Sequence, residues 1–447
     1  MSQLIEPNKV RSTLKKHILA DGYEMVLDLK KSKGPYLYDS TSGRNFLDFF
    51  TFFASNPLGM NHEKLAGDDD FIAKLGQVAI NKPSNSDVYT EEMAHFVETF
   101  SRVGIPDYMP YAFFVSGGAV AVANALKVAF DWKVQKNFEK GYRKELGHKV
   151  LHLDKAFHGR SGYTLSLTNT DPKKVKYFPK FDWPRIHNPA IKFPLNEENL
   201  AQVQKEEEQA LTQARQYFET YKDEIACILL EPIQGEGGDN HFRREFHQGL
   251  RDLADEFDAL LIYDEVQTGV VSTGKFWCHE HYVKPDILAF GKKAQVCGIL
   301  ATTRVDDIET NCFHVSSRIN STWGGNLVDM VRFDRILEVI EEENLIDHVA
   351  ECGEFLQNHL NEWASESEYV TNPRGKGLFC AIDLPNTHAR DEVIKECFKN
   401  GLMILGCGTR TIRFRPSLTI QKEHLEEGMD ILKRSYKSAL ERCPVVG

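Results

Sequence analysis

Two neighbouring stretches, LLIYDEVQTG (260–269) and PDILAFGKK (285–293), carry the strongest structural signal in this chain. Each contains a short apolar run that ends in charged residues or glycine, which is typical of a strand buried on both faces. Parallel neighbours need connections long enough to bring the chain back, and charged segments with helical spacing occur between such runs. The alternation therefore predicts a parallel α/β sheet covered by helices.

The same pattern extends in both directions along the chain. Buried strands are predicted at Tyr111–Val115, Val150–Leu153, Ala226–Leu230, Ala259–Tyr263 and Ile287–Phe290. Helices are predicted at Ala121–Lys136, Asn196–Lys222 and Arg243–Asp258. Apolar positions at helical spacing from Asn326 to about Trp363 indicate a long helix that leaves the sheet.

The ends of the chain follow a different pattern. Strand-like runs at Gly377–Leu384, Leu402–Gly406 and Thr411–Phe414 alternate with helices near 391–399 and 422–439, which predicts a compact α+β lobe. A hairpin, Tyr36–Asp39 and Asn45–Asp48 around Gly43, is expected to join that lobe. We therefore expect a large domain over 51–330 and a small domain made of 1–50 and 331–447.

Composition excludes several classes of protein. The 447 residues include 54 Lys and Arg against 65 Asp and Glu, and the net charge of −11 disfavours nucleic acid and anionic membranes as partners. The nine cysteines form no CxxC pair, which predicts reduced thiols rather than disulfides or zinc. The first twenty residues lack an apolar signal region, and no run is long enough to cross a membrane, so we expect a cytoplasmic protein.

Chemistry-bearing residues follow the predicted strands, and ligands of open α/β sheets bind at the carboxyl ends of strands. Gly117 and Gly118 open a helix after the first strand, where backbone N–H groups suit a phosphate. Phe157 follows the second strand, Asp264 the fourth, and a lysine pair, Lys292 and Lys293, the fifth. Taken singly, these residues read as a tight turn, a core aromatic and surface charges.

Metal and nucleotide sites are the first alternatives for these acids. Glu231 and Glu236 lie in one glycine-rich loop, but no nearby histidine or third acid completes a set of metal ligands, so no metal is expected. Asp264 and Glu265 resemble a magnesium-binding pair, but the GxxxxGK[ST] loop that a nucleotide hydrolase requires is absent.

The joint pattern instead predicts a site for pyridoxal 5′-phosphate. This cofactor needs a lysine for a covalent bond, a carboxylate against its ring nitrogen, a cup for its phosphate and an aromatic residue that stacks on its ring. Each has a candidate at a strand end, and their joint occurrence in one chain is more specific than any single motif.

On LLIYDEVQTG (260–269), PDILAFGKKAQVCG (285–298) and EPIQGEGGD (231–239), the chain resembles the class III, fold type I pyridoxal-phosphate aminotransferases. The resemblance runs from about residue 20 to 440 and implies the fold type I architecture. In that family the covalent lysine follows the aspartate of the preceding strand by six residues, which selects Lys292. The other cofactor contacts that the resemblance implies are Asp264 at the ring nitrogen, Gln267 near the ring hydroxyl, Gly118 and Ala119 at the phosphate, and Phe157 on the ring.

Within the family, AFHGRSGYTLSLTNT (156–170), SRINSTWGGNL (317–327) and IRFRPSLT (412–419) are most similar to the branch that moves the terminal amine of L-lysine to 2-oxoglutarate. This resemblance implies that Thr322 reaches the phosphate of a neighbouring subunit, so that a homodimer with shared sites is required. The segment SGGAVAVANAL (116–126) departs from the family, which usually carries acidic residues there.

The resemblance also implies a switchable arginine. Glutamate carries a carboxylate beside its reacting amine, whereas the ε-carbon of lysine carries none, so one arginine must change partners between the two substrates. We assign it to Arg413, with Arg415 as the second candidate, and its partner to Glu236. Arg160 is expected to hold the distal carboxylate of either substrate.

Three alternatives remain open at this point. GGDNH (237–241) and TGKFW (273–277) also fit a 4-aminobutyrate aminotransferase. A pyridoxal-phosphate aminomutase or decarboxylase would differ in needing no 2-oxoglutarate. An aminotransferase-like transcription regulator would need an added basic helix-turn-helix domain, and none precedes residue 45.

Overall fold

The computed structural model describes residues 4–442 and contains a large sheet and two small ones. The large sheet has seven strands in the order β3-β9-β8-β7-β6-β4-β5. Their bounds are β3 Tyr111–Val115, β4 Lys149–Leu153, β5 Arg185–Ile186, β6 Ile225–Leu230, β7 Leu260–Asp264, β8 Ile287–Phe290 and β9 Cys297–Ala301. The five predicted buried strands are thus confirmed within one or two residues.

The sheet is mostly, not entirely, parallel. Strands β5, β4, β6, β7 and β8 run parallel, whereas β9 is antiparallel to both β8 and β3. The sequence analysis did not place β9, which follows the lysine pair after only a short turn. A short connection permits an antiparallel neighbour but not a parallel one.

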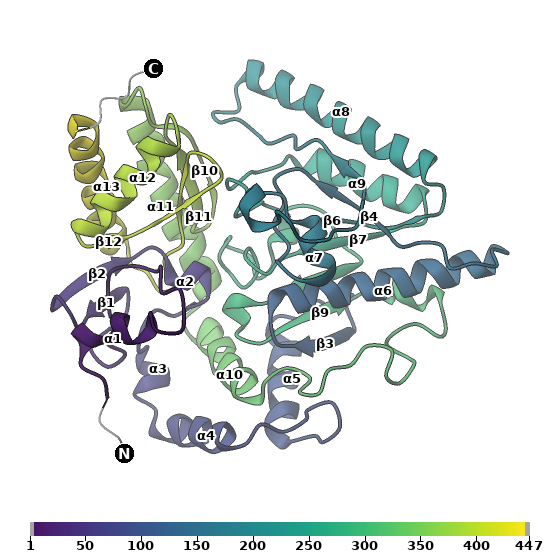
Figure 1. The fold of residues 1–447 in the computed structure, drawn as a ribbon, viewed down its shortest axis with the longest axis horizontal. Helices are drawn as coiled ribbons and strands as arrows, with labels where there is room; N and C mark the ends of the chain where they lie inside the picture. Colours follow the sequence, from purple (N-terminus) through teal and green to yellow (C-terminus); the bar gives the residue numbers. More distant parts are fainter. Residues whose placement is uncertain (1–3, 443–447) are drawn as a thin grey trace.

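Helices cover both faces of this sheet, as the right-hand part of Figure 1 shows. Alternate residues of β7 point to opposite sides: Ile262 packs in the apolar cluster of α6 (Gly118–Glu139), and Leu261 packs in that of α9 (Arg244–Glu256). The remaining helices around the large sheet are α4 Asp69–Ile80, α5 Glu91–Val103, α7 Gly162–Leu167, α8 Glu197–Thr220 and α10 Leu327–Glu342.

The two small sheets lie together on the left of Figure 1, where both chain ends also lie. In one, the hairpin β1 (Tyr36–Asp39) and β2 (Arg44–Asp48) pairs in parallel with β12 (Leu402–Met403). The predicted association of the amino-terminal hairpin with the carboxy-terminal lobe is therefore confirmed. The other sheet has the order β10-β11-β14-β13, with bounds β10 Thr371–Lys376, β11 Phe379–Asp383, β13 Leu405–Cys407 and β14 Thr411–Phe414.

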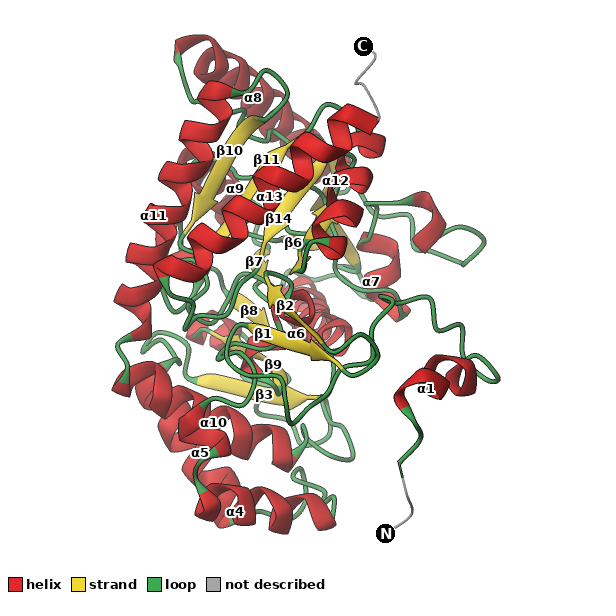
Figure 2. Ribbon diagram, turned by 90° about the vertical axis from the view of Figure 1, so that its left-hand side faces the viewer, coloured by secondary structure: helices red, strands yellow, loops and turns green. Residues whose placement is uncertain are grey.

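Helices pack against the small sheets, as Figure 2 shows from the side. They are α11 Leu345–Glu366, α12 Thr387–Lys399 and α13 Lys422–Arg442, and the short helices of the amino-terminal third are α1 Pro7–Leu14, α2 Thr51–Ala54 and α3 Glu63–Ala66. The segment from Asn326 to about Trp363, which was expected to include a long helix, contains two helices, α10 and α11. The break lies at Asn344, whose φ of +47° ends the right-handed helix, and asparagine tolerates this conformation better than most residues.

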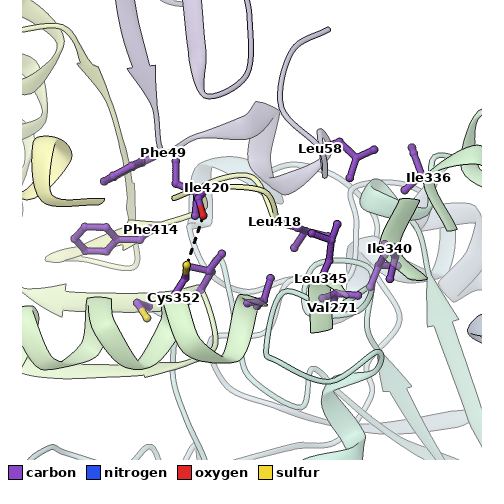
Figure 3. Close-up of a cluster of buried hydrophobic side chains, with 14 of the residues drawn as sticks. Phe49, Leu58, Val271, Ile336, Ile340, Leu345, Cys352, Phe414, Leu418 and Ile420 are labelled. Atoms are coloured by element: carbon purple, nitrogen blue, oxygen red, sulfur yellow. Dashed lines mark hydrogen bonds between the residues drawn. The ribbon is translucent and has the colours of Figure 1, made fainter. Parts of the chain in front are cut away.

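One apolar core joins the large and small sheets. Phe414 and Leu418 of the carboxy-terminal part belong to the same buried cluster as Ile336 and Ile340 of α10, and Figure 3 shows Leu418 between Phe414 on one side and the two isoleucines on the other. Helix α10 also contacts α4 and α5, whereas α11 contacts β10 and β11. The division at residues 50 and 330 stays a prediction, and residues 1–3 and 443–447 of its ranges lie outside the described part of the chain.

Two further sequence-based expectations concern cysteines and membranes. The eight cysteines between residues 4 and 442 are free and buried, as predicted, and Cys443 lies outside the described residues. Within the described chain, no helix has the length and apolar character needed to span a bilayer.

Candidate active site

A cavity of about 560 Å³ lies at the carboxyl ends of the parallel strands. It collects six of the residues predicted from sequence: Gly118, Ala119, Phe157, Asp264, Gln267 and Lys292. Its other lining residues are Ser55, Gly117, His158, Gly159, Glu231, Val266, Gln295 and Cys297. The size suits a small organic cofactor together with part of a substrate.

Lys292 enters this cavity from a tight turn directly after β8. Its φ of +51° lies in the left-handed region, which costs energy for a residue with a side chain and is concentrated at functional sites. Gln295 holds the turn by donating to the carbonyls of Ser55 at 2.9 Å and Lys292 at 3.2 Å. Burial is the main cause that lowers the pKa of Lys292 to about 8, and the positive charges of the nearby Arg413 and Arg415 act in the same direction.

Lys293, the next residue, has a different environment. Its ammonium group donates to the backbone carbonyl of Gln267 at 2.7 Å, and it does not line the cavity. It is only 3% exposed. Burial is the main cause that lowers the pKa of Lys293 well below its usual range, and the positive charge of Lys292 is the second cause. Lys293 therefore differs from the usual surface lysine at a strand end, because its amine is buried and bonded to the backbone.

Asp264 is held by a histidine at the end of β7. The Nδ1 of His158 lies 2.8 Å from Oδ2 of Asp264, and the amide of Val266 donates to Oδ1 at 3.1 Å. Because a carboxylate only accepts hydrogen bonds, Nδ1 of His158 carries the proton in this pair. Both side chains are buried. The carboxylate is thus fixed in direction at the edge of the cavity.

Glu231 fixes the loops on either side of the cavity. Its carboxylate accepts from the amide of Phe157 at 3.0 Å and from that of Gly235 at 2.9 Å. Burial raises its pKa to about 7. A Cβ at Gly235 would lie 2.4 Å from Oε1 of Gln267, so any other residue there would displace the Gln267 side chain. Glu231 therefore holds the backbone at Phe157 and at Gly235.

The start of α6 lines the cavity with Gly117, Gly118 and Ala119. Gly117 precedes the helix with a φ of +107°, and the first turn of α6 carries no acidic residue. A Cβ at Gly118 would lie 2.9 Å from Val266, so glycine allows the backbone and that side chain to approach closely. Exposed N–H groups and the positive end of the helix dipole favour a phosphate here.

Arg413 of β14 and Arg415, one residue after the end of this strand, approach the cavity from the small sheet. Nη2 of Arg413 donates to Oε2 of Glu236 at 2.8 Å, which is the pairing expected from sequence. Arg415 instead pairs with the buried Asp239 at 2.6 Å, and its guanidinium group lies 3.4 Å from the ring centroid of Phe379. Arg415 therefore pairs with a fully buried carboxylate, Asp239, whereas the carboxylate that pairs with Arg413, Glu236, is partly exposed.

Gln267 connects both arginines to the cavity. Its Oε1 accepts from Nη2 of Arg415 at 3.1 Å and from Nη1 of Arg413 at 3.4 Å. A single oxygen atom of the cavity wall, Oε1 of Gln267, is thereby hydrogen-bonded to both guanidinium groups.

Four of the predicted site residues do not line the cavity of this chain: the paired Arg413 and Glu236, and also Arg160 and Thr322. Arg160 is exposed, with its guanidinium carbon 5.9 Å from the ring centroid of Phe157. Thr322 is exposed, and its carbonyl accepts a hydrogen bond from Ser84. Their expected roles stay predictions.

His158 is the main functional candidate that the sequence analysis missed. The sequence analysis gave it no role, and the pairing with Asp264 joins residues 106 positions apart. No local spacing reveals such a pair. The useful signal was its position next to Phe157, directly after a predicted strand.

We predict that His158→Asn weakens the hydrogen bonding that holds the carboxylate of Asp264 in place. A buried hydrogen bond to a charged group contributes about 1.5–3 kcal/mol, so turnover should fall by roughly tenfold or more. The measurement is steady-state turnover together with cofactor loss on dilution. The control is His152→Asn, because His152 is also buried but bonds to Arg185 instead. Equal losses for the two variants would contradict the prediction.

Comparison with known proteins agrees with this geometry. The family described as "Aminotransferase class-III" matches residues 18–435. The chain therefore belongs to the class III aminotransferases, which depend on pyridoxal 5′-phosphate.

Three known proteins illustrate the relationship. The L-lysine-epsilon aminotransferase of Mycobacterium tuberculosis is 53% identical over 422 residues, which cover 94% of this chain and 93% of that relative. A solved structure of lysine aminotransferase from M. tuberculosis in the internal aldimine form has a TM-score of 0.95 and 51% identity, and the match covers 97% of this chain and 100% of that one. A probable mitochondrial 4-aminobutyrate aminotransferase of Caenorhabditis elegans is 32% identical over 92% of this chain and 88% of its own.

The cavity residues fit the cofactor of this family. The helix start offers N–H donors to a phosphate, Asp264 offers a fixed carboxylate, Phe157 offers a ring face, and Lys292 offers an amine. The glycine at position 118 leaves room that a Cβ would occupy.

Proposed function

We propose that this protein transfers the terminal ε-amine of L-lysine to 2-oxoglutarate, giving 2-aminoadipate 6-semialdehyde and L-glutamate. The observation that carries the proposal is the 2.8 Å ion pair between Arg413 and Glu236 beside the cavity. A neutralised arginine suits an amine donor whose reacting carbon carries no carboxylate. An arginine free to change partners suits glutamate, whose reacting carbon carries one.

The relatives support the choice of amine donor. The proteins named for lysine are far more similar to this chain than the 4-aminobutyrate aminotransferase, at 53% against 32% identity. 4-Aminobutyrate also lacks a carboxylate at its reacting carbon, so the ion pair alone does not separate the two donors. The choice of lysine over 4-aminobutyrate therefore depends on the higher overall identity to the relatives named for lysine.

The residues of the chain then have distinct roles in the proposal. Gly118 and Ala119 bind the phosphate, Phe157 packs on the ring, and Asp264 keeps the ring nitrogen protonated because a nearby negative charge favours the charged form. When bound, the cofactor supplies an electrophilic carbon and a ring that takes up electrons as a C–H bond breaks. Lys292 holds the cofactor and then moves a proton as general base and acid.

Substrate recognition is assigned to Arg413 of the small sheet and to Arg160. Arg160 is assigned to the distal carboxylate of lysine or glutamate, since a guanidinium group binds a carboxylate through two parallel hydrogen bonds. Gln267 contacts Arg413 at 3.4 Å and so lies at the boundary between cofactor and substrate.

The proposed assembly is a homodimer with shared sites, in the cytoplasm. Thr322 is exposed here and lies outside the chain's own cavity, which is what a residue serving a partner's phosphate requires. Dilution below the dissociation constant of the dimer should then remove activity. Sedimentation measured in parallel with turnover tests this part of the proposal.

The test of the reaction is a comparison of half-reactions. Holoenzyme is mixed with L-lysine, L-ornithine or 4-aminobutyrate, and the decay of the cofactor absorbance gives a rate for each. We expect L-lysine to react fastest, and 2-oxoglutarate to restore the starting spectrum. A faster reaction with 4-aminobutyrate would favour the second candidate, and spectral cycling without 2-oxoglutarate would favour a mutase.

We predict opposite effects from the two members of the ion pair. Glu236→Ala should slow the lysine half-reaction at least tenfold more than the glutamate one, because it leaves the buried Arg413 unpaired beside an uncharged carbon. Arg413→Ala should do the reverse, and Arg160→Ala should slow both. Rapid-mixing kinetics with each substrate measures the asymmetry, and equal losses for Glu236→Ala would leave the switch without support.

A further inference from the structure

Glu236 has a second cationic partner that the proposed exchange of arginine partners does not use. Nζ of Lys174 donates to Oε1 of Glu236 at 2.6 Å, while Arg413 occupies Oε2 at 2.8 Å. Each carboxylate oxygen therefore has its own cation. Burial opposes the ionisation of Glu236, but the two cations outweigh it and keep the pKa of Glu236 below its usual value.

Lys174 is held in place by its own surroundings. Its amine also donates to Oγ1 of Thr170 at 3.2 Å and lies 5.2 Å from the ring centroid of Phe157. It ends a short 3-10 helix, Pro172–Lys174, that Asp171 caps by accepting from the amide of Lys173 at 2.9 Å. Its side chain is only 15% exposed, so the contact with Glu236 is partly shielded from water.

We propose that Lys174 is a positioning residue that keeps Glu236 paired when Arg413 turns to a substrate carboxylate. This inference rests on the proposed function, in which Arg413 changes partners. With one cation only, release of Arg413 would leave Glu236 as an unpaired carboxylate in a partly closed site, which is costly. With Lys174 on the other oxygen, Glu236 keeps one counter-charge and does not need to move.

The role assigned to Lys174 predicts which half-reaction depends on it. In the lysine half-reaction Arg413 stays on Glu236, so the carboxylate is neutralised with or without Lys174. In the glutamate and 2-oxoglutarate half-reaction Arg413 binds the substrate, so Lys174 becomes the sole cation bonded to Glu236 in the described chain. Loss of Lys174 should therefore act mainly on the second half-reaction.

The test is rapid-mixing kinetics of each half-reaction with the holoenzyme of Lys174→Met. We expect kcat/KM for L-glutamate to fall about fivefold, mainly through KM, and the value for L-lysine to stay within twofold. Lys174→Arg should restore most of the glutamate rate. Lys173→Met is the matched control, because Lys173 is exposed one position away and should leave both rates unchanged.

A double-mutant cycle separates this role from general damage. In a Glu236→Gln background, Lys174→Met should add no selective loss, because the charge that it serves is gone. Lys174→Gln keeps a hydrogen-bond donor without the charge, so it tests the charge separately. It should show the same selective loss in the glutamate half-reaction as Lys174→Met. An equal loss in both half-reactions, or no loss in either, would overturn the proposal.

The outcome can be distinguished from failure of the proposed function. If the wild-type enzyme does not react with L-lysine, the proposed function is wrong, and Lys174 is then judged on L-glutamate against whichever amine the enzyme uses. If the wild-type enzyme reacts with both substrates and Lys174→Met is not selective, only the role of Lys174 is overturned.

Discussion

Replacing Lys292 with alanine is expected to abolish turnover, with a loss of roughly 10⁴-fold or more, because one amine both holds the cofactor and moves the proton. Lys292 enters the cavity at a strained turn, whereas the amine of Lys293 is bonded to the carbonyl of Gln267 at 2.7 Å. Borohydride reduction of the holoenzyme followed by peptide mapping should label Lys292 in the wild-type protein and nothing in Lys292→Ala.

Lys293→Met is the matched control for this variant. It keeps the bulk of the buried side chain, removes the bond to Gln267, and should retain both the borohydride label and measurable turnover. Persistence of the label in Lys292→Ala, or its loss in Lys293→Met, would contradict the assignment.

The low pKa of Lys292 predicts a pH dependence for the apoenzyme. Only the unprotonated amine attacks the cofactor, and a pKa of about 8 leaves far more of it unprotonated at neutral pH than an ordinary lysine pKa would. The rate of reconstitution with pyridoxal 5′-phosphate should thus rise with pH and level off above about pH 8. A rate that keeps rising up to pH 10 would mean that Lys292 is not perturbed.

The sequence was informative where chemistry follows a strand. Buried strands read as continuous apolar runs, and their carboxyl ends meet at one edge of the sheet, so the sequence predicts that Phe157, Asp264 and Lys292 lie together. Their shared cavity confirms that placement. Assignment of roles needed the family resemblance, because a single aromatic, acid or lysine is ordinary in any of these positions.

The sequence did not reveal contacts between segments that lie far apart in the chain and share no periodic pattern of residues. His158 meets Asp264 across 106 residues, and Lys174 meets Glu236 across 62, each through loops whose paths depend on tertiary packing. The break between α10 and α11 was hidden for another reason: apolar positions keep helical spacing on both sides of Asn344, and only its backbone conformation divides the two helices.

Asp264→Asn is expected to have the second largest effect. The carboxylate is fixed by two donors, His158 and the amide of Val266, so an asparagine has one acceptor oxygen where two are needed. More importantly, a neutral amide no longer favours a protonated ring nitrogen, and the electron-accepting ability of the cofactor falls. Turnover should drop by about 10²–10³-fold, the usual scale for loss of one preorganised electrostatic group.

The design of this experiment separates chemistry from binding. Asp264→Asn should still bind the cofactor and carry the borohydride label on Lys292, while proton removal from the substrate becomes slow enough that a deuterium isotope effect dominates the rate. Asp154→Asn is the matched control: it lies just after β4, its side chain is about half exposed, and it contacts Arg185 only at 3.9 Å. If Asp264→Asn kept near-normal turnover with cofactor bound, another residue would have to supply the negative charge that keeps the ring nitrogen protonated. Glu231, which is buried in the same cavity wall, would then be the next residue to replace.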